Sequence, residues 1–136
     1  MKYNRIRLRE AIKFHGHLGP YLVLGILAGG LAVKRLKCKR YFGLYVKVRG
    51  VGKKPRSCLI DGLQLSTGAT YGKGNIEKLN GSRIQMEFYN RLNQTKITLK
   101  FGDELIQRLK QAKTHNQSEK LAKQLYREKS DKLFKL

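Results

Sequence analysis

The chain has 136 residues and a formal net charge of +21, because 30 lysines and arginines outnumber 9 acidic residues. This length allows one domain to bury a core without disulfide or metal staples. The two cysteines, Cys38 and Cys58, form no CxxC pair, which argues against a disulfide framework or a zinc ribbon and favours free thiols in a cytoplasmic protein. The positive charge predicts a polyanionic partner, and nucleic acid fits it better than an anionic membrane surface does.

The first part of the chain predicts two helices joined by a polar turn. Residues 4–13 combine apolar and basic side chains in the pattern of a short amphipathic helix. The turn carries His15 and His17. Pro20 suits the first position of the next helix, with Gly19 as its N-cap, so the histidines are expected at the positive end of that helix.

The helix that begins at Pro20 is expected to be buried, because its residues are apolar nearly all round as far as Val33. This run is too short for a membrane-spanning helix, which needs roughly eighteen apolar residues. Four small residues leave a groove in which a second helix or a second subunit can lie close: Gly25, Ala28, Gly29 and Ala32.

The middle of the chain changes from helical to strand periodicity. Residues 41–51 alternate, which predicts a strand with Leu44, Val46 and Val48 on the inner face and Tyr45, Lys47 and Arg49 on the outer face. A basic loop follows over residues 50–56. Residues 57–65 are apolar enough to be buried and fit either a strand or a helix, of which we favour the helix. Residues 66–76 are too rich in glycine for regular structure.

The last third of the chain predicts a hairpin and two helices. Residues 83–90 and 96–101 alternate and are joined by a short turn. One helix opens after Gly102, and another runs from Ser118 toward Leu136. The expected fold is therefore α+β, with a small antiparallel sheet packed against the buried core helix and further helices. We expect one domain over residues 1–136, with a helical extension from about residue 102.

The charge is concentrated at the start of the chain. Residues 1–56 hold 15 basic residues against one acid, whereas residues 57–99 hold 5 against 3 and residues 100–136 hold 10 against 5. A solvated surface usually mixes the two signs, so we predict an RNA-binding face, and ribosomal RNA is one candidate ligand. The residues assigned to it are Lys34, Arg35, Lys37, Lys39, Arg40, Tyr45, Lys47, Arg49, Lys53, Lys54 and Arg56.

Three motifs carry a family resemblance. HGHLGP at 15–20, CLIDGLQ at 58–64 and TGATYGKGN at 67–75, in this order, resemble the FmdE family of formylmethanofuran dehydrogenase. The resemblance implies an archaeal-type α+β core, an intertwined homodimer and a pocket for metal or redox chemistry. It assigns His15 and His17 as metal ligands and places six further residues in the pocket: Cys58, Asp61, Gln64, Thr67, Lys73 and Asn75.

The chain departs from the family pattern at both pocket cysteines, because Gly19 and Ala69 stand in their places. Two histidines on one turn supply at most two of the three or four ligands that a stable site needs, and a lone cysteine is more often a core residue. Our leading hypothesis is therefore a non-catalytic, RNA-binding and ribosome-associated member without a cofactor. The alternative is a metal-binding or redox accessory protein of this family, holding zinc or iron.

Overall fold

The computed structural model describes residues 5–136; residues 1–4, with the expected start of the first helix at residue 4, lie outside the described part. Its α-helices are α1 (Leu8–His15), α2 (Pro20–Leu36), α3 (Cys58–Thr67), α4 (Asp103–Gln111) and α5 (His115–Arg127). Its strands are β1 (Leu44–Arg49), β2 (Ile76–Leu79), β3 (Gln85–Asn90), β4 (Lys96–Phe101) and β5 (Phe134–Lys135), and a 3-10 turn, η1, spans Ser130–Lys132.

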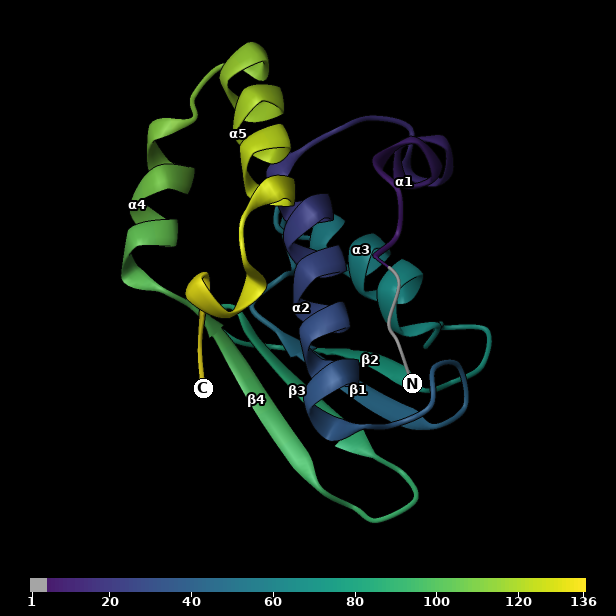
Figure 1. Cartoon of the computed structure of the whole chain (residues 1–136). Helices are drawn as coiled ribbons and strands as arrows, with labels where there is room; N and C mark the ends of the chain where they lie inside the picture. Colours follow the sequence, from purple (N-terminus) through teal and green to yellow (C-terminus); the bar gives the residue numbers. More distant parts are fainter. Residues whose placement is uncertain (1–4) are drawn as a thin grey trace.

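Helix α2 is the centre of the molecule. It begins at Pro20 with Gly19 as N-cap, as the sequence predicted, and nearly all its side chains before Lys34 are buried. Figure 1 shows α2 crossing in front of the sheet, with α4 and α5 on one side of it and α1 and α3 on the other. The apolar faces of the strands meet α2 in one main core that also takes in α3, α4 and α5. The α+β prediction is confirmed.

The sheet differs from the expected antiparallel one. Its order is β2-β1-β3-β4-β5, and β1 pairs in parallel with β2, so the sheet is mixed. Strand β2 escaped prediction because it has only four residues, two of them charged, directly after the glycine-rich turn. The expected two faces of β1 are observed: Val46 and its inner neighbours are fully buried, and Lys47 and its outer neighbours are half-exposed.

The groove on α2 is filled by α3 of the same chain. A Cβ atom on Gly25 would lie 2.3 Å from the carbonyl oxygen of Leu59, and one on Gly62 would lie 2.2 Å from that of Leu22. Ser66 Oγ also donates to the carbonyl of Gly25 across the interface, at 3.0 Å. The two backbones therefore touch, which leaves this part of α2 no room for a second subunit.

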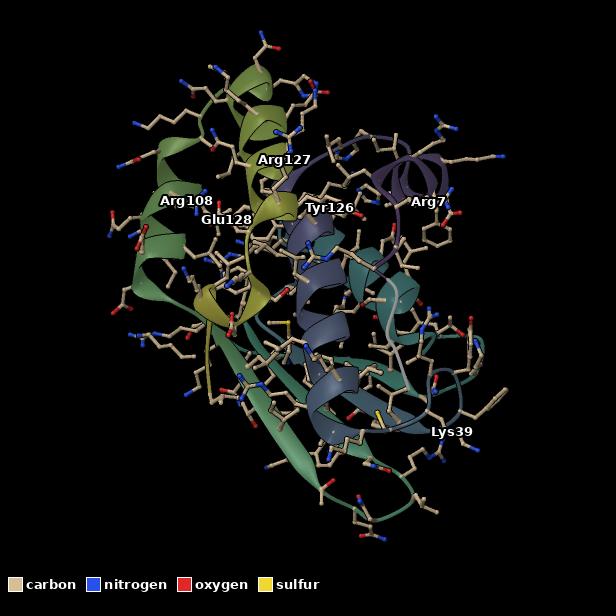
Figure 2. All side chains as sticks on the ribbon, in the orientation of Figure 1. Arg7, Lys39, Arg108, Tyr126, Arg127 and Glu128 are labelled. Atoms are coloured by element: carbon tan, nitrogen blue, oxygen red, sulfur yellow. The ribbon has the colours of Figure 1, made fainter. Side chains whose placement is uncertain are left out.

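The last α-helix has different bounds from those predicted. Helix α5 begins at His115, three residues before the predicted Ser118, because Thr114 and Gln117 form a capping box. It ends at Arg127 instead of continuing toward Leu136, and the residues after η1 add β5 beside β4. Arg108 on α4 holds the end of α5 through a bidentate pair with Glu128, at 2.8 and 2.6 Å (Figure 2).

The two ends of the described chain meet. Arg5 donates to the carbonyl of Tyr126, and the Tyr126 hydroxyl donates to the carbonyl of Ile6 at 2.7 Å. The first helix follows as α1, which starts and ends a few residues later than predicted, so that His15 is its last residue. Within residues 5–136, none of the helices has the length and apolar character needed to cross a membrane.

The close contact between α2 and α3 leads to a prediction about stability. Gly25→Ala puts a methyl group against the Leu59 backbone, so we expect it to lower the free energy of unfolding by about 1–3 kcal/mol in urea denaturation. Gly52→Ala is the matched control, because a Cβ atom there meets nothing within 4 Å and Gly52 has no positive φ. If the two variants had equal free energies of unfolding, α2 and α3 could move apart without loss of stability, which would contradict this prediction.

Candidate metal centre and basic surface

His15, His17 and Cys58 form a cluster at the junction of three elements. His15 is the last residue of α1, His17 lies in the turn before α2, and Cys58 is the first residue of α3. One potential ligand atom from each lies within 4.8 Å of the other two, and the histidine ring centroids are 4.5 Å apart. The family resemblance placed the histidines and Cys58 in one pocket, and in the structure the three side chains lie together.

Asp61 fixes the orientation of the His15 ring. Its Oδ2 lies 2.6 Å from Nδ1 of His15, so this nitrogen is occupied, and Gln64 Nε2 approaches the other carboxylate oxygen at 3.5 Å. Nε2 of His15 is buried and has no hydrogen-bond partner among the described residues, on a side chain that is only 10% exposed. Metal-binding histidines are typically held in this way, with a carboxylate on one nitrogen and the ion on the other.

The donor set fits a transition metal. Imidazole nitrogen and thiolate sulfur bind zinc or iron, with zinc–ligand bonds of about 2.0–2.3 Å. Ligands of a tetrahedral zinc ion lie roughly 3.5 Å apart, so the cluster needs a small movement to close, which the exposed His17 can supply. Gly19 borders the same space, because a Cβ atom on it would lie 3.4 Å from Cε1 of His17.

The surroundings of Cys58 favour the thiol over the thiolate. Burial, and then the negative charge of Asp61, raise its pKa above the usual value, and the opposing effect of Lys54 is smaller. Bound metal would have to displace this proton, which makes binding weaker as the pH falls.

The remaining motif residues build a turn instead of joining the cluster. The hydroxyl of Thr67 donates to the Leu63 carbonyl and accepts from the backbone of Ala69. The Asn75 amide is buried and donates to the carbonyls of Tyr41 and Leu44. Lys73 lies in the same turn, with its ammonium 5.7 Å from the centre of the Tyr41 ring.

Three arginines of the expected RNA face have contacts inside the protein. Arg40 donates to the carbonyls of Leu65 and Ser66 at the end of α3. Arg56 donates to the carbonyls of Gly50 and Ser82. Arg49 pairs with Glu87 at 3.2 Å. These side chains contribute to structure as well as to charge.

The outer face of the sheet is less basic than the sequence suggested. Tyr45 donates to Glu77 of β2, and Tyr89, the cross-strand neighbour of Tyr45, donates to Glu87. The hydrogen bond from Tyr89, together with Arg49, lowers the pKa of Glu87, so this carboxylate stays ionised. Lys47 lies over the Tyr89 ring at 5.5 Å.

The other cations of the expected face are exposed and fall into two groups. Lys34 and Arg35 lie in the last turn of α2, and Lys37 and Lys39 follow this helix. Lys53 and Lys54 lie in the loop after β1. Arg56 of that loop contacts Tyr21 near the start of α2, so the two groups lie toward opposite ends of this helix. In the described part of the chain, none of the six lies within 4.0 Å of a carboxylate.

The fold and the His–Cys cluster define an α+β protein with a candidate metal centre where α1, α2 and α3 meet. The model of the family described as "FmdE, Molybdenum formylmethanofuran dehydrogenase operon" matches residues 14–136. The chain belongs to this FmdE family.

A solved structure shows the same fold. It is a tungsten formylmethanofuran dehydrogenase FmdE-like protein from Syntrophus aciditrophicus, with 24% sequence identity and a TM-score of 0.69. The match covers 93% of this chain and 66% of that protein, so the relative is considerably longer. No curated protein matches the sequence.

The raised pKa of Cys58 gives a prediction. Alkylation by iodoacetamide needs the thiolate, so Cys58 should react more slowly than N-acetylcysteine at neutral pH and speed up only at higher pH. Peptide-resolved mass spectrometry separates it from Cys38. Asp61→Asn removes a charge that raises the pKa and should increase the rate at a given pH; a slower rate would contradict this electrostatic assignment.

Proposed function

We propose that this chain binds one transition metal ion, zinc or iron, through His15, His17 and Cys58. The observation that carries the proposal is the buried Nε2 of His15, which faces no hydrogen-bond partner in the described chain while Asp61 holds the other nitrogen. A buried polar atom left unsatisfied is costly, and a bound ion would satisfy it. The third ligand, Cys58, removes the main objection that two histidines on one turn are too few.

Three protein ligands leave one coordination position open. Such an ion can bind and polarise an oxygen atom of a ligand, whereas four protein ligands would make a closed structural site. Asp61 would keep His15 in the correct tautomer, and Gln64 would support Asp61. The proposal concerns metal binding and assigns no catalytic residue.

Metal analysis of untagged protein tests this function. We expect one zinc or iron per chain, lost in His17→Ala and in Cys58→Ser, and about 10–100-fold weaker binding in Asp61→Asn. His115→Ala is the matched control, because His115 is exposed on α5. Gly19→Cys should tighten binding by adding a fourth ligand. Wild-type protein that holds no metal after purification and titration would refute the proposal.

RNA binding is the second candidate function, supported by a different observation. Six exposed cations without carboxylate neighbours among the described residues lie within a segment, 34–56, that contains no acidic residue. Groups of exposed cations of this kind bind phosphates, and the release of counterions makes the affinity fall steeply with salt. Ribosomal RNA is one candidate ligand. Ribosome association and a homodimer stay predictions.

Replacing exposed lysines with glutamine tests the proposed RNA binding. Replacing Lys34, Lys37, Lys39, Lys53 and Lys54 with Gln should weaken RNA binding and reduce the salt slope by about one for each phosphate left without a cation. Folding should change little, because exposed charges contribute little to stability. The matched control replaces five exposed lysines on or next to α4 and α5: Lys110, Lys113, Lys120, Lys123 and Lys129. An equal weakening in both variants would contradict a specific basic surface, and His15→Ala with His17→Ala should leave RNA binding unchanged.

A further inference from the structure

Two neighbouring turns expose an unusual group of aromatic rings. Tyr41 and Phe42, before β1, are 50% and 70% exposed, and Tyr71, before β2, is 52% exposed. They are three of the six exposed large hydrophobic side chains within residues 5–136. We call them, together with Lys73, the aromatic platform. Lys39, just before it, lies at the opposite end of the molecule from Arg127 (Figure 2).

Hydrogen bonds connect the two turns to each other. The buried Asn75 accepts from the backbone of Thr70 and donates to the Tyr41 carbonyl, and the Tyr41 backbone donates to Thr67 at 2.8 Å. The turns therefore present their side chains from a fixed frame.

The backbone of Tyr41 is held in a rare conformation. Its φ is 72°, which is unfavourable for a bulky residue and persists only where the surroundings enforce it. The ring lies directly on Gly68, where a Cβ atom would be 2.4 Å from the Cδ1 atom of Tyr41. An exposed aromatic residue whose backbone is held in an unfavourable conformation is the kind of outlier that is concentrated at binding sites.

The surroundings of the platform are positively charged. The Lys73 ammonium lies 5.7 Å from the centres of both the Tyr41 and Phe42 rings, and the Arg40 guanidinium lies 4.9 Å from Tyr41. Neither residues 34–56 nor residues 62–76 contain an acid. Exposed rings with cations beside them are what proteins use to hold unpaired nucleotides, because bases stack on the rings while lysines meet the phosphates.

We infer that the aromatic platform binds single-stranded RNA by stacking unpaired bases on Phe42, Tyr71 and Tyr41, with Lys73 contacting a phosphate. The inference rests on the second candidate function and adds to it the form of the ligand and the place where the bases sit. It favours single strands because the faces of bases in a duplex are already stacked on each other. It also gives Lys73 of the family motif a role outside the metal cluster.

The experiment measures fluorescence anisotropy with the full chain and a labelled, unstructured RNA of about 12 nucleotides. The same strand annealed to its complement is the duplex probe. Phe42→Ala with Tyr71→Ala removes two exposed rings and keeps Tyr41, whose backbone supports the turn. Phe14→Ala with Leu92→Ala removes two exposed apolar side chains elsewhere and serves as the matched control.

We expect the single strand to bind more tightly than the duplex. The platform variant should lose about tenfold or more in affinity for the single strand, with an unchanged salt slope because no charge is removed. Lys73→Gln should reduce that slope by about one, and the control should bind like the wild type.

Three results would overturn the inference. If the platform variant binds like the wild type while the five-lysine variant is weakened, RNA binding stands and the platform is wrong. If the wild type binds neither probe, the second function fails together with the inference. If light scattering shows that the platform variant dissociates a dimer, the rings cover a second copy of this chain instead of RNA.

Discussion

The structure depends on the backbone contact between α2 and α3. Gly25 and Gly62 face each other with no space for a Cβ atom on either, and Ser66 bridges the helices with a hydrogen bond to the Gly25 carbonyl. Because α3 lies so close, α2 can be covered on one side by a helix and on the other by the sheet, and its apolar side chains are buried all round. The main hydrophobic core includes side chains from both helices of this pair.

The same contact creates the candidate metal centre. It fixes the first residue of α3 beside the turn that enters α2, so that Cys58 meets His15 and His17 although about forty residues separate them in the sequence. Asp61, one turn further along α3, then reaches the His15 ring. The candidate ligand set thus belongs to the junction of three helices, in a chain that has Gly19 and Ala69 where the family resemblance led us to expect cysteines.

Local patterns predicted the parts of this fold that have a strong local cause. Pro20 after Gly19 marked the start of α2, and the alternation around Val46 marked β1 and its two faces. The parallel strand β2 and the early start of α5 at His115 were missed. Strand β2 depends on pairing with a distant strand, and the start of α5 depends on a capping box between Thr114 and Gln117, outside the segment considered. The orientation of His15 by Asp61 and the internal contacts of Arg40, Arg49 and Arg56 are tertiary, so spacing in the sequence could not reveal them.

The contact between the two ends of the chain has a consequence for how the protein reaches this structure. Arg5 and Ile6 bond to Tyr126, some 120 residues later, and β5 joins the sheet only when residues 134 and 135 are present. During synthesis, α2 is complete long before α5 and β5 exist to cover it. Part of its apolar surface therefore stays exposed to water or to a chaperone until these elements have been made. Contacts this distant in sequence raise the contact order and slow folding. Folding is therefore expected to be completed only after residues 126–135 have emerged from the ribosome.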